Sequence, residues 1–339
     1  MSFTVPRTVV MGEPTYFSVI GGANPHTRNF LGLRKRVDAA RARAQWHALA
    51  ATLVAHGCEV CVIEAHRGLS GLVYPANAGF LAPAPEAGAS AGGRIFYLSN
   101  LIDTRAAERP VYQEFLSRMG YATRAVEARF EGEADFFPAG RRMVFCWGPI
   151  ERQRFVPRLG LPPWRRVYGF RSDRSALKEL AAAVAPRPVI ELELRLEAHY
   201  HGDTVLCSFG PNREFLLAYM AGLTPASRER LGDAYKDNLI ALSESDGRLY
   251  AANALQTDFD GRLFLILPRG VSGALLGAVR ERGVEPVTVD VSEFLAKGGG
   301  SVKCMVLDLG PRAEQPAAGT QFRAARSYTS LFRARPSVG

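Results

Sequence analysis

The feature that most constrains the fold is a repeated alternation of short apolar strands with helices. The first example starts with a β-branched strand at 7–11 and a turn-rich loop at 21–29. A helix is predicted over 38–56, where alanine, leucine and arginine recur at helical spacing. Gly57 follows it, in the position where glycine commonly ends a helix. A second strand is predicted at 59–64.

The same order of strand and helix returns along the rest of the chain. Further predicted strands are 94–98, 122–128, 189–194, 239–243, 263–267 and 287–291, and further predicted helices are 106–119, 172–184 and 270–282. Strands that alternate with helices in this way are typical of the α/β class.

Length and composition predict one domain with a tail. The chain has 339 residues, of which 47% are hydrophobic and 22% charged, which is a globular composition. No linker divides it, so we expect a single domain over 1–310 and a loose, basic C-terminal tail over 311–339. Small residues predict a surface loop over 82–93. Arginine and proline at 148–166 indicate an insertion that either covers a pocket or forms a plain surface loop.

Composition also excludes several classes of protein. No apolar stretch is long enough to span a bilayer, and the first residues lack the pattern of a secretory signal, so a cytoplasmic protein is expected. Five cysteines spread through a long chain predict free thiols. The net charge is +9, but the arginines are scattered and are not interleaved with aromatic residues as in a base-stacking groove. We therefore expect a solvated, arginine-rich surface and no nucleic-acid partner.

The sequence gives little support for a metal site or a phosphate-binding loop. Cys58 and Cys61 resemble half of a zinc site, but residues three apart on a strand face opposite sides of a sheet. The glycines between 88 and 93 lack the spacing of a phosphate-binding loop. No metal site is predicted.

A glycine run at 298–300 leads through Ser301–Cys304 into a predicted apolar strand. Such a run lets backbone and ligand approach closely, so Cys304 is a candidate nucleophile at a sheet edge. The alternative is a buried cysteine that acts as a small hydrophobic residue, which is common for free cysteines.

Two polar motifs supply candidate partners for this thiol. The segment His201–Thr204 leads into an apolar run and is predicted to be strand, which places His201 and Asp203 on the same face. The segment Glu131–Asp135 places carboxylates among aromatic neighbours at the expected end of a strand. Either motif alone fits a solvated turn equally well. With Cys304 they form a set of thiol, imidazole and acids able to hold a planar cation.

Seven short motifs lie in order between Met11 and Leu309. They are Asn24–Pro25, Pro75–Gly79, Glu131–Asp135, Tyr168–Ser172, His201–Thr204, Ala252–Ala254 and Gly300–Cys304. In order and spacing they resemble the superfamily of guanidino-group-modifying enzymes, which includes arginine deiminase, dimethylarginine dimethylaminohydrolase, arginine dihydrolase and the amidinotransferases. The resemblance implies an α/β fold built as a five-bladed propeller, a pentein, of ββαβ modules around a central pocket.

The resemblance also implies roles for individual residues. It makes Cys304 the nucleophile, His201 the general acid and base, and Asp135 and Asp203 the carboxylates that hold the guanidinium. The further residues implied at the substrate are Asn24, Asn77, Glu131, Arg171 and Asn253, and Glu131 is also the candidate to orient His201. This chemistry is sound, because carboxylates bind a planar guanidinium through charge-assisted hydrogen bonds, and a bound cation favours a thiolate. No metal or organic cofactor is implied.

The leading hypothesis is cysteine-dependent hydrolysis of the guanidino group of arginine or an arginine derivative, through a covalent amidino-thioether. The alternatives are an amidinotransferase that passes the amidino group to an amine acceptor, and a non-catalytic binding protein on the same fold. The cues conflict: Asn24 and Asn77 are similar to arginine dihydrolase, whereas Ala134-Asp135-Phe136 is nearer to the amidinotransferases. The expected partner is a small arginine-like substrate, and the sequence is compatible with a homo-oligomer.

Overall fold

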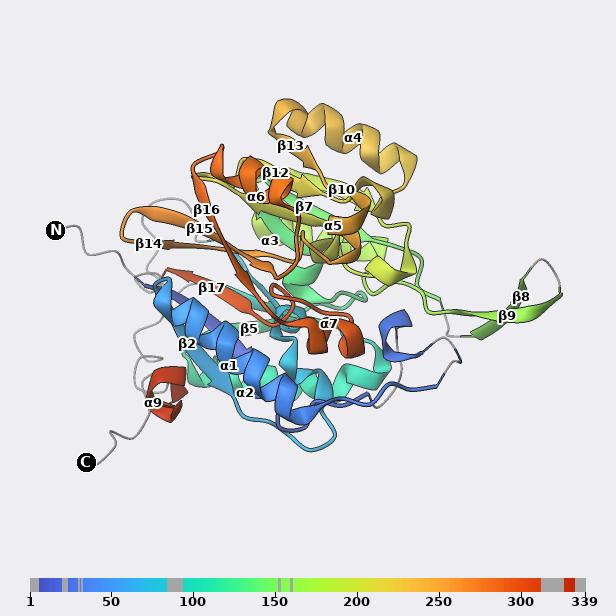
Figure 1. The fold of residues 1–339 in the computed structure, drawn as a ribbon, viewed down its shortest axis with the longest axis horizontal. Helices are drawn as coiled ribbons and strands as arrows, with labels where there is room; N and C mark the ends of the chain where they lie inside the picture. The colour runs from blue at the N-terminus through green and yellow to red at the C-terminus, as the bar shows by residue number, and fades with distance from the viewer. Residues whose placement is uncertain are drawn as a thin grey trace.

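The computed structural model describes residues 6–19, 24–29, 31, 33–83, 94–151, 154–158, 161–311 and 326–332. Among these residues, five three-stranded sheets share one topology (Figure 1). In each sheet an edge strand pairs antiparallel with a middle strand, and the middle strand pairs parallel with a third strand. A helix connects the middle strand to the third, so the predicted mixed α/β architecture is confirmed.

The strands of each sheet follow in the order edge, middle, third. They are β17 (Leu307–Pro311), β1 (Arg7–Gly12) and β2 (Cys58–Ile63); β3 (Gly79–Leu81), β4 (Ile95–Leu98) and β5 (Ala122–Ala125); β6 (Phe136–Ala139), β7 (Arg142–Trp147) and β10 (Val189–Glu193); β11 (Leu206–Phe209), β12 (Phe215–Ala218) and β13 (Leu239–Ala241); β14 (Leu255–Phe259), β15 (Arg262–Pro268) and β16 (Val284–Val289). The connecting helices are α1 (Ala39–Ala55), α2 (Arg109–Arg118), α3 (Leu177–Val184), α4 (Pro225–Tyr235) and α6 (Gly273–Arg280), and further short helices are α5 (Glu244–Arg248), α7 (Ser292–Gly298) and α9 (Tyr328–Phe332).

Helix α1 shows how local sequence sets an element. The side chain of Asp38 accepts a hydrogen bond from the backbone N–H of Arg41 at 3.0 Å and so caps the helix. Gly57 ends it with φ +82°, a conformation that costs glycine little. One face of the helix buries Trp46 and Leu49 against the first sheet, which contributes about 1.5–3 kcal/mol for each side chain.

The first sheet takes its edge strand from the far end of the chain. Strand β17 pairs with β1 in the register Val9↔Asp308. The Arg7 guanidinium donates two hydrogen bonds to the Asp308 carboxylate, at 2.7 and 2.8 Å, which adds a bidentate ion pair to the ladder. Residues from both ends of the described chain therefore share one sheet.

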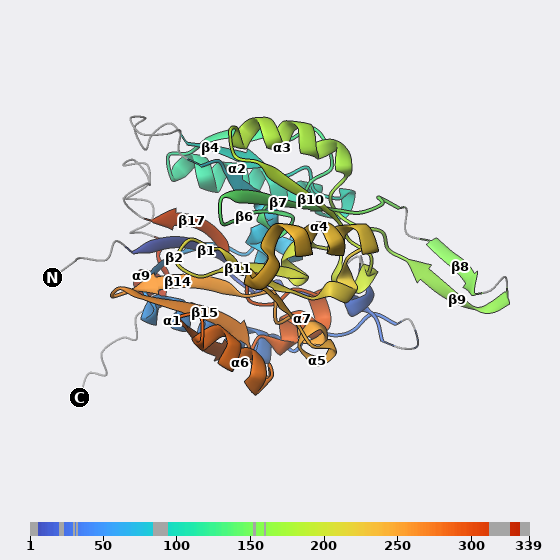
Figure 2. The same cartoon turned by 90° about the horizontal axis from the view of Figure 1, so that it is seen from above.

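Two segments of the predicted surface differ from expectation. Part of the insertion at 148–166 is a hairpin of β8 (Arg154–Arg158) and β9 (Leu161–Val167), which projects from the body of the protein (Figures 1 and 2). Part of the predicted loose tail is helix α9, whose Tyr328 and Phe332 rings pack edge-on against Trp46. Residues 84–93 of the predicted loop, 21–23 of the first loop, and 312–325 and 333–339 of the tail lie outside the described residues.

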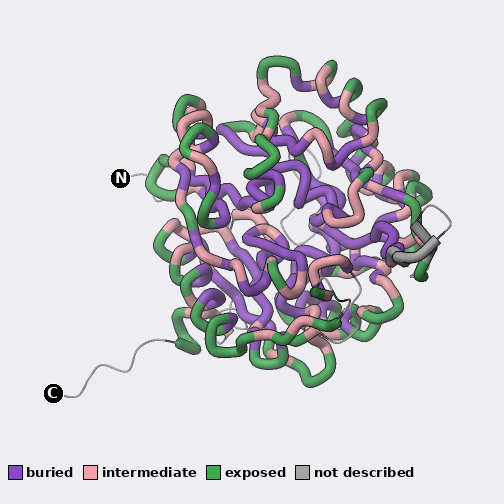
Figure 3. Tube along the Cα trace, turned by 45° about the vertical axis from the view of Figure 1, so that its right-hand side comes forward, coloured by how far each residue is buried: buried purple, intermediate pink, exposed green. Residues whose placement is uncertain are grey.

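Buried residues form the interior between the sheets and their helices, and exposed residues lie on the outer turns and helix faces (Figure 3). Cys58 and Cys61 belong to two different hydrophobic clusters, as expected for residues on opposite faces of a strand. In the described part of the chain, no helix combines the length and the apolar character needed to cross a membrane.

Candidate active site

Most of the candidate residues occupy the same position in successive sheets, directly before an edge strand. Asn77 precedes β3, Asp135 precedes β6, Asp203 precedes β11, Asn253 precedes β14 and Cys304 precedes β17. Short 3-10 turns hold three of these positions: η3 (Pro75–Ala78), η6 (Gly132–Ala134) and η9 (Gly202–Thr204). Turn η6 contacts both η3 and η9. The repeated topology therefore brings residues that are distant in sequence to one end of the sheets.

Close packing of these turns requires glycine. A Cβ atom on Gly132, which has φ +70°, would lie 2.5 Å from the backbone oxygen of Ala76. A Cβ atom on Gly202 would lie 2.5 Å from Sγ of Cys146. Both contacts are shorter than van der Waals distance, so a side chain at either glycine would push the polar turns apart.

The secondary structure predicted for two motifs is wrong, while the Cys304 segment leads into a strand as expected. His201–Thr204 is not strand, because Gly202–Thr204 forms a 3-10 turn and β11 begins at Leu206. The acidic motif lies before strand β6 instead of at the end of a strand. Cys304 lies in a turn, and strand β17 begins three residues later.

A cavity of about 310 Å³ opens beside these turns. Its described lining includes six of the nine predicted site residues, which are Asn24, Asn77, Glu131, Arg171, His201 and Cys304. Aromatic walls come from Phe17, Tyr74 and Tyr200. Among the hairpin residues whose side chains the structure describes, none lines this cavity.

Asn253 and Asp203 surround Cys304. The amide of Asn253 accepts hydrogen bonds from the backbone N–H groups of Ser301 and Cys304, at 3.1 and 3.0 Å, and its Nδ2 donates to Sγ at 3.1 Å. The thiol in turn donates to Oδ2 of Asp203 at 3.3 Å. Burial raises the pKa of the Cys304 thiol well above its ordinary value, and Asp203 adds to the increase. Both influences favour the neutral thiol.

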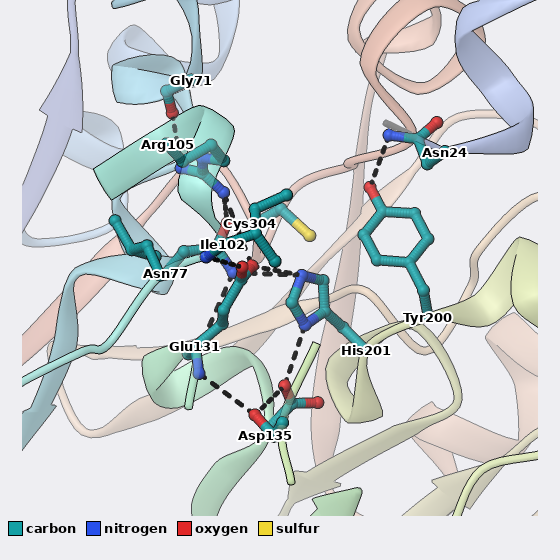
Figure 4. A network of polar contacts seen from close by, with 12 residues as sticks. Asn24, Gly71, Asn77, Ile102, Arg105, Glu131, Asp135, Tyr200, His201 and Cys304 are labelled. Carbon is teal, nitrogen blue, oxygen red and sulfur yellow. Dashed lines mark hydrogen bonds and ion pairs between the residues drawn. The ribbon is translucent and has the colours of Figure 1, made fainter. Parts of the chain in front are cut away.

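His201 lies between two carboxylates, shown in Figure 4. Its Nδ1 is 3.0 Å from Oδ2 of Asp135, and its Nε2 is 3.2 Å from Oε2 of Glu131. Burial alone would lower the pKa of His201, but Asp135 and Glu131 more than offset it and raise the pKa to about 9. The ring is thus an imidazolium at neutral pH, which is the form of a general acid.

The two remaining acids differ in charge state. Burial opposes the ionisation of Glu131, but His201 and Arg105 outweigh it and hold its pKa at about 2. Burial raises the pKa of Asp203 to about 6, against the opposite influence of His201 and Lys303. Oε2 of Glu131 pairs with Nε2 of His201 at 3.2 Å and lies 3.8 Å from Nη1 of Arg105. A carboxylate oxygen has more than one lone pair, so it can accept a further N–H donor in the cavity.

Comparison with known proteins assigns the chain to a superfamily. No protein-family model matches it. It is 32% identical over 308 residues to N(G),N(G)-dimethylarginine dimethylaminohydrolase of Mycobacterium tuberculosis, an alignment that covers 90% of this chain and 87% of that protein. This chain belongs to the guanidino-group-modifying enzymes.

Solved structures of the same superfamily share the fold. The N-terminal domain of ArgZ, in a covalent complex with a reaction intermediate, aligns with a TM-score of 0.73 at 22% identity, covering 89% of this chain and 97% of that one. A related ArgZ structure is described as an arginine dihydrolase from cyanobacteria. A dimethylarginine dimethylaminohydrolase in an adduct with S-methyl-L-thiocitrulline aligns with a TM-score of 0.62 at 18% identity, covering 90% and 100%. At these identities the likeness concerns the fold alone.

Asp135 lies in a different place from the one expected for a residue that holds the substrate. Its Oδ2 accepts hydrogen bonds from His201 and from the Ser172 hydroxyl, at 3.0 and 2.6 Å, and its Oδ1 accepts from the backbone N–H of Gly202 at 2.8 Å. It is fully buried behind the imidazole and is not part of the cavity lining. Asp135 therefore contacts one nitrogen of His201, and Glu131, the candidate to orient the ring, contacts the other.

The other predicted residues frame the cavity. Asn24 donates to the backbone oxygen of Gly298 at 2.8 Å and to the Tyr200 hydroxyl at 3.2 Å. The guanidinium of Arg171 stacks over the Tyr200 ring at 4.9 Å. Asn253 and Asp203 contact Cys304 without lining this cavity.

Arg105 is a site residue that sequence reasoning missed. It donates to Oδ1 of Asn77 at 2.8 Å, to Glu108 at 2.7 Å and to the backbone oxygen of Gly71 at 3.0 Å. Nδ2 of Asn77 donates to the backbone oxygen of Glu131 at 3.4 Å and lies 3.4 Å from Nε2 of His201. The Arg105-x-x-Glu108 spacing was the available signal, because residues three apart on a helical turn can pair.

Proposed function

We propose that this protein hydrolyses the guanidino group of arginine or an arginine derivative, with Cys304 as the nucleophile. The observation that carries the proposal is that Cys304, His201 and Glu131 line one cavity, while Asp203 contacts the sulfur from beside it. A guanidinium bound there would meet a thiol, an acid catalyst and carboxylate acceptors at once. The relative from Mycobacterium tuberculosis, named as a dimethylaminohydrolase, supports the same reaction class.

The first half of the reaction follows from the charge states. A guanidinium held by the ionised Glu131 and Asp203 adds positive charge next to Sγ, which lowers the pKa of the thiol, and the thiol proton passes to solvent. The thiolate adds to the central carbon of the guanidinium. The imidazolium of His201 protonates one nitrogen, the C–N bond breaks, and an amine leaves. An amidino-thioether on Cys304 remains.

The second half regenerates the enzyme. The neutral imidazole of His201 takes a proton from water, and the hydroxide adds to the amidino carbon. The C–S bond then breaks, a ureido product leaves and Cys304 is again free. In this scheme Asp135 holds the ring of His201 in position. Asn253, predicted from the resemblance to bind substrate, instead donates its amide N–H to the thiolate of Cys304.

The cationic side chains that line the cavity support an arginine-like substrate. Arg105, Arg171 and Lys297 line it, and a guanidinium can pair with a carboxylate through two hydrogen bonds. We propose that the α-carboxylate of the substrate lies against Arg171, and that methyl groups on a substrate nitrogen would lie near Tyr74 or Phe17.

A product assay tests the proposal and separates it from amidino transfer. Wild type and Cys304→Ser would be incubated with arginine or with N(G),N(G)-dimethylarginine, first alone and then with glycine or ornithine. Release of ammonia or dimethylamine with citrulline or ornithine, without any acceptor, supports hydrolysis. A new guanidino product that forms only with the acceptor shows a transferase instead. Equal results for wild type and Cys304→Ser would favour a non-catalytic role.

We further propose that the five sheets are the blades of a propeller formed by residues 1–310. The edge strands β3, β6, β11, β14 and β17 all contribute residues to one cavity, which is what a ring of five blades around a common axis requires. The pairing of β17 with β1 supports the same arrangement, because it joins the end of the repeat to its beginning.

A further inference from the structure

A second cavity, of about 210 Å³, is lined by Lys303 and Asp203, which adjoin Cys304. Each edge strand adds at least one apolar side chain to its wall; these are Phe80, Phe136, Leu206, Leu255 and Leu309. Consecutive residues divide between the two cavities, since Cys304 lines the first and Lys303 the second. Asp203 also lines the second cavity, while its carboxylate contacts the sulfur at 3.3 Å.

The described wall of the second cavity carries both cationic and anionic side chains, four of the first and three of the second. Three of these cations have close partners. Arg7 pairs with Asp308, Lys303 pairs with Glu133 at 2.7 Å, and Arg94 donates to the backbone oxygen of Ala82 at 3.1 Å. The third carboxylate, Asp203, is engaged with Cys304.

Arg213 makes only long contacts with the described groups of this wall. Its shortest contact with a carboxylate is 3.6 Å, to Asp308, which Arg7 already binds at both oxygens. It also donates to the backbone oxygen of Ser208 at 3.4 Å, a long hydrogen bond. The side chain is 22% exposed, and a partly buried guanidinium with incomplete pairing is costly unless a further anion joins it.

The backbone conformation at Arg213 also suggests that this residue belongs to a binding site. Its φ is +54°, in the left-handed region that non-glycine residues rarely adopt, within the turn between β11 and β12. Strain of this kind tends to persist at binding sites, where the surrounding structure fixes the residue. Here it places an arginine in the wall of a mainly apolar cavity.

We propose that the second cavity binds a small apolar carboxylate, whose anionic group pairs with Arg213 and whose body lies against Phe80, Phe136 and Leu255. The size is suitable, because an apolar cavity of about 150 Å³ accommodates benzene and this one is somewhat larger. A ligand of the size of benzoate would satisfy the guanidinium and fill the apolar space. The cationic and apolar parts of the wall together exclude both a plain hydrocarbon and a strongly hydrated ion such as phosphate.

The position of the cavity gives the ligand an effect on the proposed active site. An anion near Lys303 and Asp203 adds negative charge close to Cys304, which disfavours its thiolate. The bound carboxylate would therefore slow the reaction of the thiol with a neutral alkylating reagent. This consequence rests on the proposed function of Cys304, whereas the binding itself does not.

Titration calorimetry with benzoate tests the binding, and benzamide is the matched neutral probe. We expect saturable binding of benzoate, at least tenfold weaker binding of benzamide, and at least a tenfold loss of benzoate affinity in Arg213→Leu, the size expected for one charge-assisted hydrogen bond. Arg213→Lys keeps the charge and should retain most of the affinity. Arg269→Leu, at an exposed arginine outside the cavity, is the control and should bind as wild type.

Three results would overturn the proposal: no saturable benzoate binding, equal binding of benzamide, or unchanged affinity in a folded Arg213→Leu protein. If Arg213→Leu does not fold, the comparison of benzoate with benzamide decides. Iodoacetamide labelling then measures the coupling, and we expect benzoate to slow alkylation of Cys304 severalfold in wild type and not in Arg213→Leu. A protein that binds benzoate but turns over no guanidino compound would contradict the proposed function and leave the second site standing.

Discussion

Asn253 holds Cys304 at both ends, because its Oδ1 accepts the backbone N–H of the cysteine at 3.0 Å while its Nδ2 donates to Sγ at 3.1 Å. Asn253→Ala should lower kcat about 10- to 100-fold, since it removes a donor to the thiolate and leaves buried backbone N–H groups unpaired. KM should change much less, because Asn253 does not line the substrate cavity. Steady-state kinetics would check this, with Asn212→Ala, at an exposed position, as the control. A change confined to KM would place Asn253 at the substrate instead.

Asp135 and Glu131 should set the alkaline limit of activity. The pKa of His201 is raised to about 9, so the protonated general acid is present below that pH and is lost as the pH rises through it. Asp135→Asn removes the charge that contributes most to stabilising the imidazolium of His201. The decrease of kcat/KM at high pH should therefore begin at a lower pH, and kcat at pH 8 should fall on the order of 100-fold. A substrate-holding role for Asp135 predicts a higher KM with an unmoved alkaline limb, and the pH profile separates the two.

Asp203 should set the acidic limit. Its pKa is raised to about 6, so the carboxylate that receives a guanidinium is present above that pH and is lost below it. We therefore expect kcat/KM to fall as the pH drops through about 6. Asp203→Asn should abolish this decrease of kcat/KM at low pH. It should also lower kcat/KM about 10- to 100-fold, the effect of losing one charge-assisted hydrogen bond of about 1.5–3 kcal/mol. Asp237→Asn, at an exposed aspartate, is the control and should change neither the value of kcat/KM nor its dependence on pH.

The fold was predictable from sequence where local signals were complete. The bounds of helix α1 were predicted to within one residue, because its two ends are set locally. Asp38 caps the first turn, and Gly57 ends the helix in a left-handed conformation. The hairpin β8–β9 was missed, since its arginines and prolines carry no strand periodicity. Four residues such as His201–Thr204 cannot distinguish a strand from a 3-10 turn, because the choice depends on the packing of η9 on η6.

For the site, the sequence could predict which residues come together but not how they contact one another. Order and spacing of motifs indicated that Cys304, His201 and Asp203 converge, and the structure brings them together. Which acid meets which nitrogen of His201 is decided by tertiary contacts, namely the Ser172 hydroxyl and the Gly202 N–H that fix Asp135 behind the ring. Sequence spacing does not encode that choice.

Cys304 should be the cysteine that a cationic alkylating reagent modifies. A haloacetamidine resembles a guanidinium, so it should bind beside Glu131 and Asp203, promote the thiolate and alkylate Sγ at neutral pH. Arginine or dimethylarginine should protect the thiol from it. Cys146 is also buried but does not line this cavity, and its pKa is raised by burial, so it serves as the internal control. Peptide mapping by mass spectrometry measures the outcome. Preferential labelling of Cys146 or Cys58, or labelling of Cys304 that substrate does not slow, would show that the cavity does not select a flat cation for this thiol.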